Sequence, residues 1–117
     1  MKNHPESDLQ KLCVKYLMLA HPHCFFYHSP NEGKRSPQYW NWLKSLGTKT
    51  GMLDLLIFDA KKGFNGLAIE LKSGKGTLTK NQKDMIKNFE LVNWQVYICS
   101  SFESFQKAVD DYFSKAW

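Results

Sequence analysis

The sequence has few cysteines and no long apolar run, and these absences bound its class. Three cysteines, Cys13, Cys24 and Cys99, stand among 117 residues. They are an odd number without close pairing, so we expect reduced core residues rather than a disulfide framework. No apolar run approaches the roughly 18 residues that a membrane span needs, and the polar opening differs from a signal peptide. We therefore expect a soluble, cytoplasmic protein without a membrane partner.

Internal repeats and low-complexity tracts are also absent from the sequence. A chain of 117 residues is long enough to bury one hydrophobic core, so we expect residues 1–117 to form a single domain. Acidic residues are fewer than basic ones, 11 against 16, which gives a formal net charge of +5. This excess favours a polyanionic partner, and we expect that partner to be nucleic acid.

Helical and strand patterns alternate along the chain. Apolar residues at three-and-four spacing predict helices over 5–20, 37–46 and 79–91, and a fourth from the Ser100–Glu103 segment to Phe113. Strand composition predicts strands over 24–28, 53–58, 67–72 and 94–99. The connection from Leu71 to Trp94 contains a helix and is long enough for a parallel crossover. The order therefore predicts an α/β fold with a mixed central β-sheet flanked by α-helices.

Capping signals support three of these helices. Thr79 and Gln82 match the capping box that begins a helix, and Ser100 with Glu103 offers a second one. Pro37 begins the helix that Gly47 would cap. That helix carries large aromatic residues, and we expect most of them to be buried, although some could form a dimer surface or stack on bases.

The two central strands are separated by a polar turn and should form an antiparallel hairpin. If the turn is centred near Lys62 or Gly63, equal counting outward places Asp54 opposite Glu70 or Lys72. Glu70 and Lys72 share one face because strand side chains alternate. Two carboxylates and an ammonium thus converge at one end of an apolar hairpin. Such an arrangement is costly unless a cation such as a metal ion neutralises the acids.

Five stretches of the chain together form a recognisable pattern. They are Glu6 with Gln10, His-Ser-Pro-Asn-Glu-Gly-Lys-Arg at 28–35, Leu-Gly-Thr-Lys-Thr-Gly-Met-Leu-Asp-Leu at 46–55, Ala-Ile-Glu-Leu-Lys at 68–72 and Thr-Leu-Thr-Lys-Asn-Gln at 77–82. Through these stretches the chain resembles the VRR-NUC nucleases of the PD-(D/E)XK superfamily. The likeness spans nearly the whole chain and is that of a stand-alone bacterial or phage nuclease domain. It implies a restriction-endonuclease-like fold.

The resemblance also implies a metal-dependent catalytic site. Asp54 and Glu70, helped by the carbonyl of Leu71, would bind Mg²⁺ or Mn²⁺, hard cations that take oxygen ligands. Lys72 would orient the attacking water and stabilise the charge that develops on the phosphate. Glu6 would bind a second metal or its water shell, unless it only complements the dipole of the first helix. Gln82 would position water or Lys72, with helix capping as its alternative role.

A second set of residues would contact nucleic acid. The loop after His28 contains two prolines and a glycine, and basic residues gather in it and beyond it. His28 is also a rival candidate for the general base, because its unperturbed pKa suits that role, but we favour a phosphate contact or simple packing. The residues expected at the nucleic acid are His28, Asn31, Lys34, Arg35, Lys49 and Lys75.

The sequence departs from the superfamily at one position and leaves alternative functions open. Leu53 replaces the proline that precedes the metal-binding aspartate, which removes a backbone constraint but keeps the Asp54 carboxylate. The resemblance implies a Mg²⁺- or Mn²⁺-dependent, structure-selective DNA endonuclease, in particular a homodimer that resolves four-way (Holliday) junctions. The alternatives are a branched-DNA-binding module of nuclease ancestry that no longer cuts, and a small protein-interaction domain.

Overall fold

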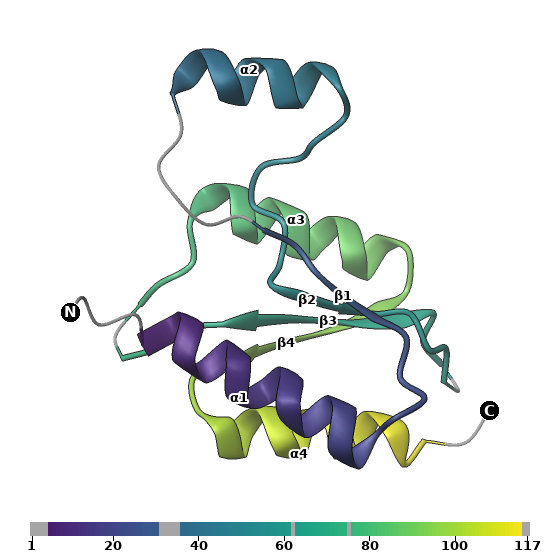
Figure 1. The fold of residues 1–117 in the computed structure, drawn as a ribbon. Helices are drawn as coiled ribbons and strands as arrows, with labels where there is room; N and C mark the ends of the chain where they lie inside the picture. The colour runs from purple at the N-terminus through teal and green to yellow at the C-terminus, as the bar shows by residue number, and fades with distance from the viewer. Residues whose placement is uncertain (1–4, 31–35, 62, 75, 116–117) are drawn as a thin grey trace.

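The computed structural model describes residues 5–30, 36–61, 63–74 and 76–115, and of residues 5 and 6 it describes the backbone alone. Each predicted helix and strand is present, although the first two strands are shorter than expected (Figure 1). The elements follow in the order α1 (Pro5–Ala20), β1 (Phe26–His28), α2 (Pro37–Ser45), β2 (Leu55–Ile57), β3 (Gly66–Leu71), α3 (Lys80–Leu91), β4 (Trp94–Cys99) and α4 (Phe102–Phe113).

The strands form one mixed sheet in the order β1-β2-β3-β4. β1 and β2 pair antiparallel, β2 and β3 pair antiparallel, and β3 and β4 pair parallel across the α3 crossover. Leu55 pairs with Ile69 and Ile57 pairs with Leu67, a register that brings Asp54 opposite Glu70. The expected hairpin and the expected α/β fold class are therefore confirmed.

Helices cover both faces of the sheet. α1 and α4 lie on one face and α3 lies on the other (Figure 1). Because strand side chains alternate, Leu67, Ile69 and Leu71 of β3 face α1 and α4, where they are buried in the larger core cluster. Ala68 faces α3 and belongs to a smaller cluster with Leu53. The even-numbered residues of β3 therefore point toward α3, and Glu70 is one of them.

α2 stands apart from these layers (Figure 1). Ser36 caps its first turn, Pro37 is its first residue, and Gly47 follows it with a φ of +106°. No residue of α2 is buried, and the Trp42 side chain is 55% exposed. The expectation that its aromatic residues lie mostly in the core is therefore wrong. The physical reason is that α1, α4 and α3 already cover both faces of the sheet.

The second predicted capping box is displaced by one residue. α4 begins after Ser101, whose hydroxyl accepts the Ser104 N–H at 3.1 Å, while the Ser104 hydroxyl accepts the Ser101 N–H at 3.1 Å. Ser101 and Ser104 thus form the reciprocal pair in place of Ser100 and Glu103. A serine at the third helical position replaces glutamate in this role because its hydroxyl also reaches the capping N–H.

The three cysteines are free thiols, as expected. Cys13 and Cys99 are fully buried in the core between the sheet and α1 and α4. Burial raises the pKa of the Cys13 thiol to about 12, so this side chain behaves as a small apolar residue and not as a nucleophile. Among the described residues, no helix combines the length and the apolar composition that crossing a membrane requires.

Candidate active site

The β2–β3 hairpin brings two carboxylates to one end of the sheet. Asp54 directly precedes β2 and Glu70 is the penultimate residue of β3, so antiparallel pairing sets them side by side. Asp54 Oδ2 accepts a hydrogen bond from the backbone N–H of Leu71 at 2.7 Å, which fixes the aspartate against β3. The N–H and C=O of one strand residue point to the same edge, so the carbonyl of Leu71 also faces Asp54.

Glu70 is the buried acid of this pair, with a residue exposure of 3%. Its Oε2 accepts a hydrogen bond from Gln82 Nε2 at 2.8 Å and lies 3.3 Å from Lys72 Nζ. Its Oε1 is buried and has no hydrogen-bond partner within the described part of the chain. A buried carboxylate oxygen normally has a donor, so this atom is an open acceptor for a group that binds from outside.

The electrostatic environment disfavours a second negative charge in the pair. Burial, followed by the charge of Asp54, raises the pKa of Glu70 to about 7, although Lys72 acts in the opposite direction. One lysine therefore does not compensate the two acids. A bound cation would supply the missing positive charge.

The donor set of this site fits a hard divalent cation. It consists of oxygen atoms: the carboxylates of Asp54 and Glu70 and the carbonyl of Leu71. Within the described ranges there is no cluster of three or more His, Cys, Asp or Glu residues, so a site made wholly of such side chains is not formed there. Mg²⁺ typically takes one or two protein carboxylates and keeps waters and substrate phosphate as its other ligands. The residues present therefore match Mg²⁺ or Mn²⁺ better than Zn²⁺.

Gln82 links the start of α3 to the buried acid. Its side-chain Oε1 accepts a hydrogen bond from the backbone N–H of Thr79 at 3.0 Å. Its backbone N–H donates to the Thr79 hydroxyl at 3.1 Å, which completes the predicted capping box. The Nε2 of the same amide donates to Glu70. The expected capping role is therefore present, and the same amide also donates to Glu70, whereas the positioning of water or Lys72 by Gln82 stays a prediction.

Gly51 is a structural determinant of the site that the sequence analysis missed. It has a φ of +76°, and a Cβ on it would lie 2.4 Å from the backbone carbon of Asn81 in α3. This close approach holds the segment before Asp54 against the first turn of α3, next to Gln82. The only signal in the sequence was a glycine two residues before Leu53, where the predicted strand begins.

A pocket of about 260 Å³ opens the site to solvent on the α3 side. Asp54 and Gln82 contribute to its wall, and α2 contributes Trp40. The remaining wall consists of Met52 and of small or polar residues from the segments that Gly51 brings together. The lining residues are Trp40, Thr50, Gly51, Met52, Asp54, Thr79, Asn81 and Gln82.

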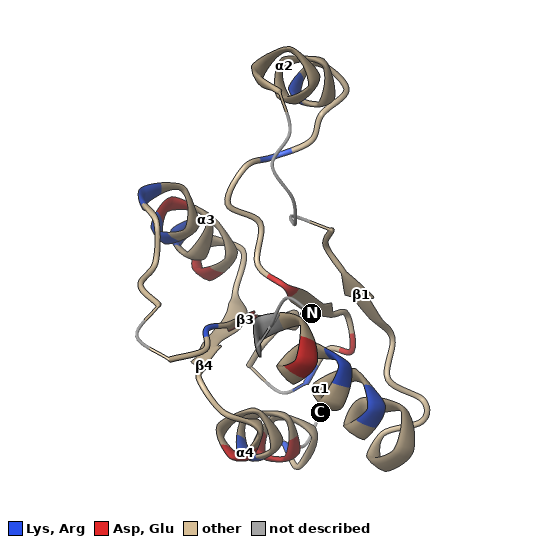
Figure 2. Ribbon diagram, turned by 60° about the vertical axis from the view of Figure 1, so that its left-hand side comes forward, with Lys and Arg blue, Asp and Glu red and all other residues tan. Residues whose placement is uncertain are grey.

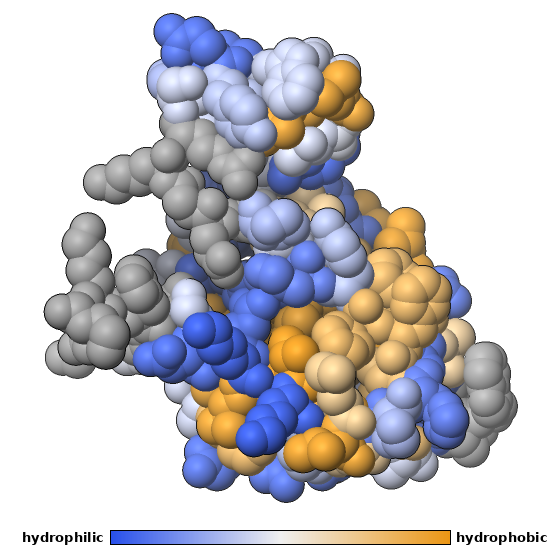
Figure 3. All heavy atoms as spheres, viewed as in Figure 1, coloured by the Kyte–Doolittle hydropathy of each residue, from blue (hydrophilic) through white to orange (hydrophobic). Residues whose placement is uncertain are grey.

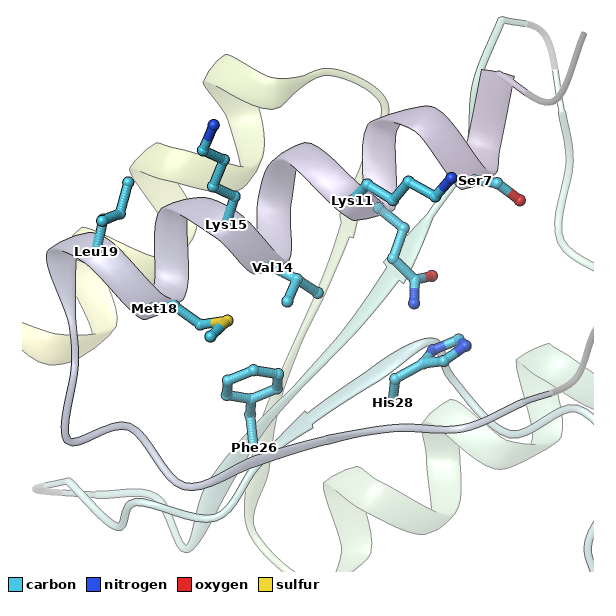
Figure 4. A pocket seen from close by; sticks show the side chains of 9 residues that line it. Ser7, Lys11, Val14, Lys15, Met18, Leu19, Phe26 and His28 are labelled. Carbon is cyan, nitrogen blue, oxygen red and sulfur yellow. The ribbon is translucent and has the colours of Figure 1, made fainter.

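His28 lies near the site but on the opposite face of the sheet. It pairs with Leu55, whose side chain is in the core under α1 and α4, whereas Glu70 points toward α3. The Nδ1 atom of His28 is 3.0 Å from the backbone oxygen of Asp54. His28 therefore contacts the strand that carries Asp54, and its ring faces α1 (Figure 4). This placement does not favour His28 as the base for a water bound between the carboxylates.

The expected nucleic-acid contacts are only partly described. Lys49 is exposed on the connection between α2 and β2, next to Thr50, which lines the pocket. Four other predicted site residues lie outside the described residues, and for a fifth, Glu6, the side chain is not described. These five are Glu6, Asn31, Lys34, Arg35 and Lys75.

Comparisons with known proteins bear on the fold. No protein-family model matches the sequence, and a comparison with curated proteins gave no match. A solved structure titled "VRR_NUC domain protein" is similar over 99% of this chain and 93% of its own, with a TM-score of 0.82 and 21% sequence identity. At this identity the similarity concerns the arrangement of the elements. The chain therefore has the VRR_NUC domain fold, which confirms the resemblance seen in the sequence at the level of structure.

Proposed function

We propose that the chain is a metal-dependent nuclease that hydrolyses phosphodiester bonds in DNA. The observation that carries this proposal is the Asp54–Glu70 pair, in which a buried Glu70 oxygen has no described hydrogen-bond partner and the Lys72 ammonium lies beside the other oxygen. The fold shared with a VRR_NUC domain protein and the net charge of +5 support it. Phosphodiester hydrolysis needs such an arrangement because negative charge accumulates on the phosphate.

Each residue of the site has a distinct part in this reaction. Asp54, Glu70 and the Leu71 carbonyl would hold Mg²⁺ or Mn²⁺, which when bound lowers the pKa of a water and polarises a phosphoryl oxygen. The Leu71 N–H fixes Asp54, and the Gln82 amide fixes Glu70. Lys72 shares the face of Glu70 and presents positive charge where the scissile phosphate would lie. We assign Lys72 to orienting water and stabilising the phosphate rather than to proton abstraction.

Single substitutions test the assignment. Asp54→Ala, Glu70→Ala and Lys72→Ala should abolish Mg²⁺-dependent cleavage of labelled DNA while DNA binding persists. Asp111→Ala and Lys107→Ala are matched controls, because they remove an exposed carboxylate and an exposed ammonium of α4, away from the site. Both controls should cut like the unmodified protein. Full cleavage by Asp54→Ala would remove the proposal.

The substrate we propose is branched DNA, in particular a four-way junction cut by a homodimer. Two sites related by two-fold symmetry can nick opposing strands. The exposed apolar residues of α2, including Trp42, support a dimer because a nine-residue helix without a buried face gains little stability alone. Linear, flap, fork and four-way-junction DNA should be compared with and without Mg²⁺ or Mn²⁺. Equal cutting of all four would contradict the junction preference.

Sedimentation measurements test the dimer separately. The protein should sediment as a dimer, and Trp42→Glu should shift it toward a monomer by placing a charge on the exposed face of α2. Gln38→Glu, on the same helix, is the control for added charge. A monomer at all concentrations would contradict the homodimer without affecting the proposed chemistry.

A DNA-binding module without cleavage is the alternative that Leu53 brings forward. Leu53 is fully buried and packs with Leu56 and Ala68 in the core cluster facing α3. Packing therefore fixes the chain before Asp54 where the superfamily uses proline, which favours an intact site. Calorimetric titration with Mn²⁺ separates the two functions. A nuclease should bind Mn²⁺, and Glu70→Ala should abolish that binding. A DNA-binding module without cleavage need not bind Mn²⁺.

A further inference from the structure

A groove of about 670 Å³ runs between α1 and the edge strand β1, on the face of the sheet opposite Glu70. Val14 and Met18 of α1 point toward the Phe26 ring of β1 (Figure 4). The Met18 side chain is 62% exposed, so the groove is open to solvent. Figure 3 shows apolar surface along α1 with hydrophilic side chains beside it. The proposed nuclease chemistry does not use this groove.

β1 is the edge strand beside the groove, and within the described residues no strand pairs with its outer side. Phe25 O accepts the Phe58 N–H at 2.8 Å, and the Ser29 N–H donates to Asp54 O at 3.0 Å, so the odd-numbered residues of this segment face β2. In an antiparallel pair the residues between them turn their N–H and C=O groups the other way. The N–H and C=O of Phe26 therefore point away from β2, toward the edge of the sheet.

The edge strand is flanked by apolar side chains on its other face as well. Phe25 is 67% exposed and contacts Phe58 with a ring-centroid distance of 5.1 Å. Proteins usually protect an open edge by keeping the strand short, with charged residues or by covering it, and β1 is short, at three residues. β1 carries neither a lysine nor an acidic residue. An exposed, apolar and uncharged strand edge of this kind is a template for another strand.

We propose that an extended peptide segment adds to β1 as a further strand and places an apolar side chain in the groove. Its flanking residues would be acidic, because Lys11 and Lys15 border the groove and form no ion pair with a described acidic residue. Peptide recognition of this type takes affinity from backbone hydrogen bonds and specificity from a pocket for alternate side chains. The groove and the Phe26 edge supply these two parts.

Two other occupants fit the observations less well. Lys11, Lys15 and His28 of the lining could contact phosphate, but DNA would leave unused the apolar floor made by Val14, Met18 and Phe26 and the backbone edge of β1. A second copy of this chain, paired through its own β1, would present the segment 24–30, which contains no acidic residue to complement Lys11 and Lys15. An acidic and apolar peptide satisfies the backbone edge, the groove and the lysines together.

A displayed library of random peptides, each of about twelve residues, tests the proposal on the full chain. Selected peptides should carry apolar residues at alternate positions with acidic neighbours. Their affinity should fall about tenfold or more with Met18→Glu and with Lys11→Glu plus Lys15→Glu. Leu12→Glu is the matched control, because Leu12 is 48% exposed on the same helix and does not line the groove. It should leave peptide affinity unchanged, and all variants should still cut DNA.

Hydrogen exchange gives the second readout. A bound peptide should slow exchange of the Phe26 amide, and N-methylation of the peptide amides should abolish binding. A library without any Met18-dependent binder would overturn the proposal, as would bound peptides that leave Phe26 exchange unchanged. If Met18→Glu instead converts a dimer to a monomer, the groove is a contact between copies. If it weakens duplex DNA binding, the groove belongs to the DNA interface, and either result also overturns the proposal.

Discussion

Glu70 illustrates how one side chain can serve function at the expense of stability. Its carboxylate is buried beside Asp54, and these surroundings raise its pKa to about 7 from an ordinary value of 4.5. We predict that Glu70→Gln raises the free energy of unfolding of the metal-free protein at pH 8, by about 1 to 3 kcal/mol. The lower value of this range applies if loss of the ion pair between Glu70 and Lys72 offsets part of the gain. Denaturant unfolding in EDTA measures this change.

The same substitution should remove the response to metal. A cation that binds the folded protein raises its unfolding temperature, so Mn²⁺ should stabilise the unmodified protein and leave Glu70→Gln unaffected. Glu90→Gln, an exposed position at the end of α3, is the matched control and should keep the Mn²⁺ response. A Glu70→Gln protein that is less stable in EDTA than the unmodified one would show that the Lys72 contact outweighs burial and the Asp54 charge.

Asp110 provides a pH-dependent contact between α1 and α4. Burial raises its pKa, but hydrogen bonds from His21 at 2.8 Å and from the Tyr16 hydroxyl at 2.7 Å outweigh that effect, and the net pKa lies below the ordinary value. A lowered pKa stabilises the fold above the unfolded-state pKa and loses that contribution as pH falls. We predict that Asp110→Asn destabilises the protein by about 1 kcal/mol at pH 7, after allowing for solvent exposure. The difference should vanish below about pH 3.

Thermal unfolding of the two proteins between acidic and neutral pH measures this difference. Asp111→Asn, at the exposed neighbouring position, is the control and should show little change at any pH. A destabilisation by Asp110→Asn that persists unchanged at the lowest pH would indicate lost packing rather than lost charge.

At the level of elements, Gly51 joins the segment before β2 to the start of α3. Its positive φ and its contact with the Asn81 backbone exclude a side chain. We predict that Gly51→Ala destabilises the protein by about 2 to 4 kcal/mol and lowers cleavage, because Asp54 and Gln82 shift relative to each other. Gly47→Ala is the matched control, since Gly47 also has a positive φ but nothing within 4 Å of a built Cβ. It should cost about 1 kcal/mol and leave cleavage unchanged.

The elements themselves were predictable because their signals are local. Apolar spacing, the Thr79–Gln82 capping box and Pro37 each act over a few residues, and the helices they predicted are present. The exposure of α2 was not predictable, because the sequence of an aromatic helix is the same whether or not the sheet has a free face for it to cover. The contact between Gly51 and Asn81 was hidden for a similar reason, since it joins segments that the sequence separates by 30 positions.

At the scale of the whole molecule, the hairpin explains why the site could be predicted. Counting outward from a turn fixes which residues face each other, and the register set Asp54 opposite Glu70 as expected. The side of the sheet on which His28 lies depends on a third strand, so residue spacing alone did not assign it. The groove at β1 was also beyond prediction, because it exists only where α1 crosses the edge of the assembled sheet.

Charge differs between the two faces of the sheet, and this difference predicts where DNA binds. α3 carries Lys80, Lys83 and Lys87 with two acidic residues, whereas α1 and α4 on the other face together carry three lysines and five acidic residues (Figure 2). The pocket beside Asp54 is lined by Thr79, Asn81 and Gln82 at the start of α3, and Lys49 is exposed next to Thr50, which also lines it. DNA should therefore approach from the α3 face.

Salt dependence of DNA binding tests this orientation. Each phosphate contact releases counterions, so the logarithm of the binding constant should fall linearly with the logarithm of salt concentration. We predict that Lys49→Ala in a non-cleaving Asp54→Ala background reduces that slope by about 1, because it removes one phosphate contact. Lys107→Ala on α4 removes the same charge from the opposite face and should leave the slope unchanged. Equal effects of the two substitutions would mean that net charge, and not a defined DNA-facing surface, governs binding.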